Sequence, residues 1–345
     1  MPSHAEKSLG RKLGQLIILG FKGQFVPDRI LEDLATRNLG GIVLTTANEN
    51  LGSPAQIQKV LRQIREVSKT PPFLAIDQEG GKVARLNATN GFSSTSSAYH
   101  LGTTAGSLDA TRAQAGLMAS WLQSCGFNMN LAPVADVNVN PLSPTIGLPQ
   151  RSYSVDPLSV AAHDRAFIEE FHKRKIITVL KHFPGHGSAG TDSHVTLPDI
   201  TTSWTDTELI PYRELLNGGC VDMVMIGHLY NAALDDTFPS SLSRATIQGL
   251  LRDSLGFRGV AITDDLHNMM AITANFGYWD AAEHAINAGV DILLYGSNEA
   301  DSFPLCSQLI NVLESKVRHG IIAESRIDEA YNRIQQLKNR YAFEA

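Results

Sequence analysis

The sequence contains few cysteines, no run of basic residues and no long hydrophobic segment. Its three cysteines among 345 residues are Cys125, Cys220 and Cys306, and no two of them show C-x-x-C spacing. An odd and widely spaced set predicts reduced thiols rather than a disulfide framework. The net charge is −6, and charges of both signs are mixed along the chain, which argues against nucleic acid as a partner.

The first apolar run, residues 16–20, is too short to span a membrane or to form the core of a signal peptide followed by a cleavage site. We therefore expect a cytoplasmic protein with no membrane insertion. The same sequence would be left if an export signal had been removed.

The sequence also lacks the glycine motifs of nucleotide binding, since no G-x-G-x-x-G follows the first predicted strand and no G-x-x-x-x-G-K-[ST] occurs. Eight runs rich in Val and Ile predict strands instead, at 15–20, 40–45, 73–77, 128–134, 176–181, 221–227, 259–263 and 290–295. Helical periodicity lies between them, at 53–69, 108–124, 157–173, 244–255 and 279–288. Hydrophobic strands that alternate with helices indicate a parallel sheet, and eight repeats is the number that closes a (β/α)8 TIM-type barrel.

No linker, repeat or low-complexity tract divides the chain, so we predict a single catalytic domain over residues 1–345. With 43% hydrophobic residues the chain can bury a full core. Residues 303–319 and 325–341 follow the last strand with helical periodicity, and we expect them to pack on the outside of the barrel.

Polar side chains follow five of the predicted strands at their carboxyl ends. They are Asp77, Asp136, Lys181 with His182, His228, and Asp264 with Asp265. In a (β/α)8 barrel the active site is built at this edge, so these side chains are expected to converge on one pocket. We expect Asp265, directly after Asp264, to cap the next helix rather than to react.

The segment 181–194 concentrates titratable groups in a loop that is rich in glycine. Its glycines are Gly185, Gly187 and Gly190. Because glycine adopts many backbone conformations, we expect the loop to be mobile. Asp192 and His194 lie two residues apart, so a turn would let the carboxylate accept a hydrogen bond from the imidazole.

Two mechanistic classes fit these residues. In the first, Asp264 attacks a glycosidic carbon and His194 donates a proton to the leaving group. In the second, a divalent ion held by His182, His186, His194 and an aspartate activates water. The ammonium group of Lys181 beside His182 argues against a cationic site, and we expect no metal and no cofactor.

The combination of motifs resembles glycoside hydrolase family 3, specifically its β-N-acetylhexosaminidase branch. The motifs are Asp77-Gln-Glu-Gly-Gly, Leu131-Ala-Pro-Val-Ala-Asp-Val, Arg151-Ser-Tyr, Lys181-His-Phe-Pro-Gly-His-Gly, Asp192-Ser-His and Thr263-Asp-Asp-Leu. The resemblance runs from about Leu13 to the final predicted helix. Its fold is a TIM-type barrel, in agreement with the strand count.

The resemblance implies that Asp264 is the nucleophile and that Asp192 and His194 form the general acid/base pair. It also implies that the terminal sugar is bound by five further residues, which are Asp77, Arg85, Arg151, Lys181 and His182. The expected protein is a retaining exo-β-N-acetylglucosaminidase, and its partner is a carbohydrate with a terminal β-linked N-acetylglucosamine. The Asp-x-His pair favours this branch over the β-glucosidases, whose acid/base carboxylate lies outside this loop.

Three points stay open. The family pattern Asp-Asp-Leu-x-Met reads Asp264-Asp265-Leu266-His267-Asn268-Met269 here, with one additional residue in what should be the pocket wall. Some members of this branch use phosphate in place of water, and a histidine would repel that anion less than a carboxylate would. The sequence therefore leaves hydrolase and phosphorylase as alternatives. It also leaves two substrates open, a cell-wall muropeptide fragment, as the resemblance to this branch implies, or a chitin oligosaccharide.

Overall fold

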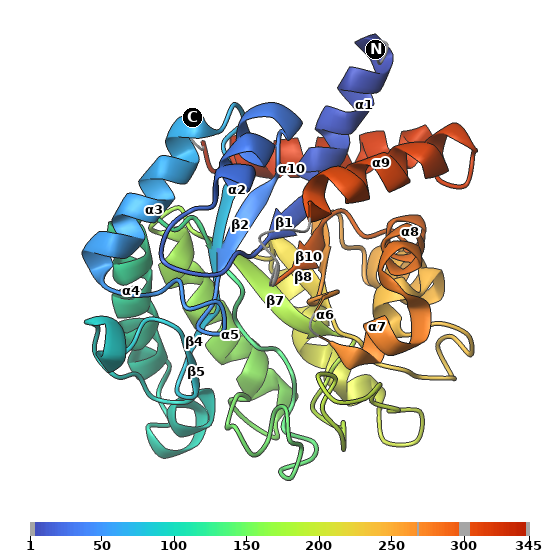
Figure 1. Ribbon diagram of the computed structural model, residues 1–345. Helices are drawn as coiled ribbons and strands as arrows, with labels where there is room; N and C mark the ends of the chain where they lie inside the picture. The colour runs from blue at the N-terminus through green and yellow to red at the C-terminus, as the bar shows by residue number, and fades with distance from the viewer. Residues whose placement is uncertain (1–3, 268, 297–303, 343–345) are drawn as a thin grey trace.

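Eight parallel strands form the centre of the molecule in the computed structural model, which describes residues 4–267, 269–296 and 304–342 (Figure 1). The strands are β1 (Ile17–Leu19), β2 (Gly41–Leu44), β3 (Phe73–Ile76), β6 (Met129–Asn130), β7 (Ile177–Phe183), β8 (Met223–Ile226), β9 (Val260–Thr263) and β10 (Leu293–Tyr295). They pair in the order β10-β1-β2-β3-β6-β7-β8-β9, and a parallel bridge between Ile262 and Ile292 joins the two ends. This arrangement confirms the predicted (β/α)8 barrel.

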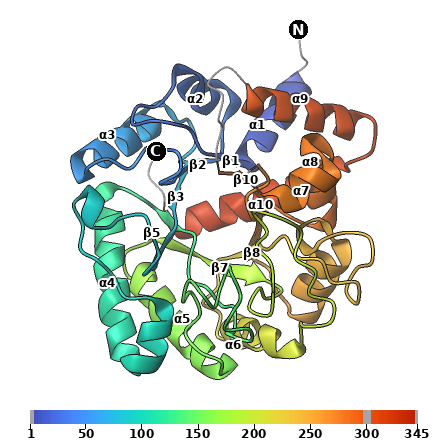
Figure 2. The same ribbon diagram turned by 60° about the horizontal axis from the view of Figure 1, so that its bottom comes forward.

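Helices surround the strands as a ring (Figure 2). The α-helices are α1 (His4–Gln15), α2 (Asp28–Glu32), α3 (Pro54–Val67), α4 (Leu108–Cys125), α5 (Pro157–His172), α6 (Ile210–Asn217), α7 (Met270–Phe276), α8 (Tyr278–Ala288), α9 (Leu305–Arg318) and α10 (Glu324–Arg340). Shorter helical turns of 3-10 or π type are Asp33–Arg37, Ala88–Asn90, His100–Thr104, Asp206–Leu209, Ser240–Leu242 and Ala245–Ser254. The five helices predicted between strands all occur, the one at 244–255 as a π-helix, whereas α1, α2, α6 and α7 were not predicted.

Capping residues set the bounds of the helices that the sequence predicted well. Helix α3 begins after Ser53, whose hydroxyl accepts the backbone N–H of Gln56, and Pro54 occupies its first turn. Helix α4 ends at Gly126, which has a φ of 98° and so takes a left-handed conformation that favours glycine.

The strand predicted at 128–134 is regular only over Met129–Asn130. Pro133 has no N–H to donate to a sheet, although the next residue, Val134, still bridges Lys181 of β7. A short hairpin of β4 (Gln78–Gly80) and β5 (Val83–Ala84), also not predicted, follows β3.

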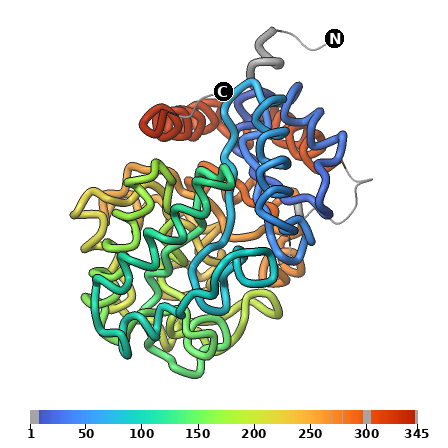
Figure 3. The backbone as a smooth tube through the Cα atoms, turned by 90° about the vertical axis from the view of Figure 1, so that its left-hand side faces the viewer, coloured from blue at the N-terminus to red at the C-terminus, as the bar shows by residue number. Residues whose placement is uncertain are grey.

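Helix α10 lies across the amino-terminal ends of the strands, at the top of the view in Figures 1 and 3. The Lys338 ammonium donates to the Gln15 side chain at 2.8 Å and to the Gly40 carbonyl at 3.3 Å, and Arg333 binds Asp291 at 3.0 Å. The expected start of α9, at Phe303, lies outside the described residues. Because α10 covers this end of the barrel, the loops at the carboxyl ends of the strands are left to form a pocket.

None of the described helices is long and apolar enough to cross a membrane.

Candidate active site

A pocket of about 330 Å³ lies at the carboxyl ends of the strands. Its lining includes Asp77, Glu79, Arg85, Thr145, Arg151, Lys181, His182, His186, His194 and Asp264. The structure thus brings together seven of the eight predicted site residues, and the eighth, Asp192, binds His194. This volume lies in the range of small-molecule sites.

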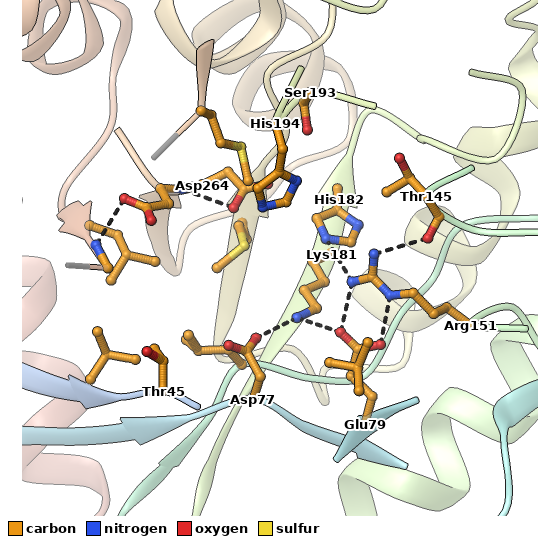
Figure 4. A pocket seen from close by; sticks show the side chains of 18 of the residues that line it. Thr45, Asp77, Glu79, Thr145, Arg151, Lys181, His182, Ser193, His194 and Asp264 are labelled. Atoms are coloured by element: carbon orange, nitrogen blue, oxygen red, sulfur yellow. Dashed lines mark hydrogen bonds and ion pairs between the residues drawn. The ribbon is translucent and has the colours of Figure 1, made fainter. Parts of the chain in front are cut away.

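A network of charges forms one side of the pocket (Figure 4). Arg151 donates two hydrogen bonds of 2.8 Å to the two carboxylate oxygens of Glu79. The Lys181 ammonium lies 2.7 Å from Glu79 and 2.8 Å from Asp77. Burial alone would raise the pKa of Glu79, but Arg151 and Lys181 hold it well below its usual range. Glu79 is therefore ionised and cannot serve as a proton donor.

Glu79 is a site residue that the sequence reasoning did not place among the substrate-binding groups. The signal was available, because Asp77 and Glu79 stand two residues apart in an extended segment and therefore share a face. Arg85 lies farther from the network, with its guanidinium 3.8 Å from Asp77, and remains available to a ligand.

His182 is fixed between a carboxylate and an arginine. Its Nε2 lies 3.3 Å from Nη2 of Arg151, which can only donate, so Nε2 accepts and the ring proton lies on Nδ1. Nδ1 donates to Asp136 at 2.7 Å. The other Asp136 oxygen accepts the backbone N–H groups of His182 and His186, at 3.2 and 2.8 Å. Asp136 was expected at the pocket but lies behind it, where it orients His182.

Asp264 follows β9 directly and is only 8% exposed. One carboxylate oxygen accepts the backbone N–H of Asp265 at 2.9 Å. Burial alone would raise the pKa of Asp264, but the nearby His182 and His228 rings, this hydrogen bond and the Lys181 ammonium bring it below its ordinary value. An ionised, nearly buried carboxylate at the pocket is equipped to act as a nucleophile.

His228, which was expected to reach the pocket, is fully buried behind Asp264. Its Nε2 donates to the Asp265 carbonyl at 3.1 Å, so its Nδ1 accepts from the Ser241 hydroxyl at 2.7 Å. The Asp265 side chain accepts the backbone N–H groups of His267 and Gly296, at 2.9 and 2.8 Å. It holds a turn to the end of β10. The expectation that Asp265 caps the next helix was wrong, because α7 begins at Met270 after Met269 and has no side-chain cap.

Described residues on both sides of the motif's additional position pack in or near the pocket. Leu266 is buried, and Met269 is buried and lines the pocket. Asn268, which lies between them in the motif, is outside the described residues.

Asp192 and His194 contact each other as the spacing suggested. One oxygen of Asp192 accepts the backbone N–H of His194 at 2.9 Å and lies 2.8 Å from its Nδ1. Burial alone would raise the pKa of Asp192, but these two hydrogen bonds lower it. His194 is more than half exposed, and Nε2 is the ring atom left to meet a ligand.

The three histidines of the metal alternative have separate surroundings. His182 binds Asp136, His194 binds Asp192, and neither ring nitrogen of the buried His186 has a partner among the described residues. No group of three His, Cys, Asp or Glu side chains in the described ranges is arranged to hold a metal ion. The metal-dependent mechanism therefore lacks a ligand set in this part of the chain.

Comparison with known proteins supports the motif evidence. The family model described as the glycosyl hydrolase family 3 N-terminal domain matches residues 8–337. The chain belongs to glycoside hydrolase family 3. Within this family it is 35% identical to a β-hexosaminidase of Tolumonas auensis, covering 81% of this chain and 82% of that protein. It is 32% identical to β-hexosaminidase A of Pseudoalteromonas piscicida, covering 91% of this chain and 56% of that protein.

Solved structures of the family share the barrel. A glycoside hydrolase family 3 β-N-acetylglucosaminidase from Paenibacillus sp. str. FPU-7 superposes with a TM-score of 0.90 at 35% identity, over 98% of this chain and 63% of that one. A β-N-acetylhexosaminidase from Beutenbergia cavernae superposes with a TM-score of 0.85 at 27% identity, over 96% of this chain and 98% of that one. The chain therefore spans nearly the full length of one relative and less than two thirds of others.

The buried His186 should make the stability of the folded protein depend on pH. Burial and the nearby His182 lower the pKa of His186 from 6.5 to about 4 in the folded protein. The unfolded chain binds this proton more readily, so stability from the neutral ring is present above pH 6.5 and is lost as the pH falls towards 4. The loss amounts to at most about 3 kcal/mol. The melting temperature of the wild type, relative to His186→Phe, should fall between pH 7 and pH 4.5. A difference that stays constant over this range would contradict the assignment.

Proposed function

We propose that the protein is a retaining exo-β-N-acetylglucosaminidase that removes terminal β-linked N-acetylglucosamine. The observation that carries the proposal is a single pocket lined by the ionised Asp264 and by His194, whose other ring nitrogen is bound by Asp192. A nucleophile and a proton donor at one pocket are the two parts that a double displacement requires. The β-hexosaminidase relatives support the choice of sugar.

In the first half-reaction Asp264 attacks the anomeric carbon of the terminal sugar and displaces the glycosidic oxygen. His194 donates the proton that this oxygen needs, from Nε2, because Nδ1 is bound by Asp192. The product is a covalent glycosyl-enzyme through an Asp264 oxygen. In the second half-reaction Nε2 takes a proton from water as the water attacks the same carbon, and Asp264 leaves. Two inversions give net retention of the β configuration.

The charge network would hold the sugar during both steps. Lys181 and Arg85 present hydrogen-bond donors to its hydroxyls, and Asp77 presents acceptors. His182 and Arg151, fixed by Asp136 and Glu79, would complete the contacts with the hydroxyls and the N-acetyl group. Because Glu79 and Asp136 already bind their cationic or polar partners, these groups need not reorganise when the sugar enters.

A phosphorylase that uses phosphate as the acceptor is the second candidate. The observation that favours it is the imidazole at the acid/base position, because a histidine beside the anomeric carbon repels an incoming anion less than a carboxylate does. Muropeptide fragments and chitin oligosaccharides both end in the required sugar, so both stay candidate substrates. A cytoplasmic location also stays a prediction.

The first test is turnover of an aryl β-N-acetylglucosaminide compared with the aryl β-glucoside, each with and without phosphate. We expect the N-acetylglucosaminide to be the better substrate, with free sugar as the product in both buffers. Formation of a sugar phosphate would identify the phosphorylase instead, and preference for the glucoside would contradict the proposed specificity.

The second test separates the proton donor from a binding residue. His194→Ala should slow substrates with poor leaving groups by about 100-fold or more, because general acid catalysis contributes on that scale. It should slow aryl glycosides much less, because a phenolate leaves with little protonation. Asp192→Ala should show the same trend more weakly. Equal losses on both kinds of substrate would mean that His194 only binds the sugar.

A further inference from the structure

The loop that carries Asp192 and His194 has a buried base and an exposed tip. Residues 181–189 are buried, whereas most of residues 190–195 are exposed or partly exposed. Only Gly190 of the three glycines has open space, with no heavy atom within 4 Å of a Cβ built on it. The three glycines therefore differ in their surroundings, and mobility of the loop stays a prediction.

Close packing explains why the other two positions are glycine. A Cβ on Gly187 would lie 1.7 Å from the Val137 carbonyl oxygen, and one on Gly185 would lie 2.5 Å from Cβ of Glu208. Gly185 also has a φ of 126°, which favours glycine. The base is thus pressed against two fixed segments, the loop after β6 and the helical turn Asp206–Leu209.

Glu208, on that turn, reaches the base with a fully buried side chain. Its Oε2 accepts the backbone N–H of Gly187 at 2.8 Å. On the same side of the loop, the indole N–H of Trp204 donates to the Pro184 carbonyl at 3.1 Å. No lysine or arginine in the described ranges forms an ion pair with Glu208, so this carboxyl is buried without a cation.

The groups around Glu208 disfavour its charge. Burial is the largest effect, and the Asp136 carboxylate adds to it. The hydrogen bond from the Gly187 N–H offsets only part, so the pKa of Glu208 rises to about 7. Burying a carboxyl lowers the stability of the fold. We therefore expect the contact between Glu208 and the loop base to serve the function of the loop.

We infer that Glu208 is a positioning residue of this site, which fixes the backbone at Gly187 so that the tip carrying Asp192 and His194 turns about Gly190. Asp136 holds the first part of the base through the N–H groups of His182 and His186, and Glu208 holds the next residue. The tip also accepts a backbone hydrogen bond from α7, from the Ala271 N–H to the Ser193 carbonyl at 3.3 Å. The inference rests on the proposed function of Asp192 and His194.

Two substitutions isolate the hydrogen bond from the volume of the side chain. Glu208→Gln keeps an oxygen that can accept from Gly187, whereas Glu208→Met fills nearly the same space without an acceptor. Glu214→Met, at an exposed position of α6, is the matched control. The readouts are turnover of a substrate with a poor leaving group, turnover of an activated aryl glycoside, and amide hydrogen exchange over residues 182–190.

We expect Glu208→Met to lower kcat on the poor leaving group by about tenfold or more, since general acid catalysis is sensitive to the place of the acid. Turnover of the aryl glycoside and both KM values should change much less. Exchange of the Gly187 amide should become faster. Glu208→Gln and Glu214→Met should resemble the wild type in all three readouts.

Equal loss on both substrates in Glu208→Met would overturn the inference and leave Glu208 with a purely structural role. Unchanged exchange at Gly187 would overturn it as well, and so would a Gln variant as impaired as the Met variant. Hydrogen exchange does not depend on the reaction, so it tests the anchor even if the wild type does not cleave the aryl glycoside, a result that would count against the proposed function alone.

Discussion

The pocket depends on a largely buried cluster in which two carboxylates, Asp77 and Glu79, face the cations of Lys181 and Arg151. None of these charges could be buried alone. Removing one partner from such a cluster typically costs about 3–5 kcal/mol, because the remaining charge is left uncompensated. The cluster therefore holds itself together before any sugar binds, and it presents fixed donors and acceptors to a ligand that is rich in hydroxyls.

The barrel brings this cluster opposite the reacting groups. Asp77, Lys181 and Asp264 come from three different strand ends, and parallel strands place those ends at one edge. The carboxyl groups of Glu79, Asp264 and Glu208 have different pKa values because their surroundings differ. Glu79 is held ionised by two cations, Asp264 by basic groups and a backbone N–H, and Glu208 has no cation and a raised pKa. These differences suit a fixed pocket, a nucleophile and a structural anchor respectively.

The strands and most of the pocket residues could be predicted because each is marked by a pattern of neighbouring residues in the sequence. Buried parallel strands read as continuous hydrophobic runs, and the residue after each strand is polar where it faces the pocket. The motifs also gave Asp264 and the Asp192 and His194 pair, which lie in short segments. The short helices α2, α6 and α7 were missed because a few turns give little periodicity.

What the sequence could not predict depends on contacts between distant residues. Asp136 reaches His182 across 46 positions, and Glu208 reaches Gly187 across 21. The local pattern placed Asp136 at a strand end but did not identify His182 as its partner, and Glu208 does not differ in its local pattern from a surface residue. The three glycines of the loop look alike in the sequence, and only packing against Val137 and Glu208 separates the two at its base from the one at Gly190.

The most direct measurement of the central claim is to trap the glycosyl-enzyme with an activated 5-fluoro derivative of N-acetylglucosamine and to locate the label by peptide mass spectrometry. Asp264 is ionised and lines the pocket, so the account predicts one sugar per chain, attached to Asp264 and absent from Asp264→Ala. A label on Asp265 or Asp77 would contradict it, since the first holds a turn and the second belongs to the binding cluster.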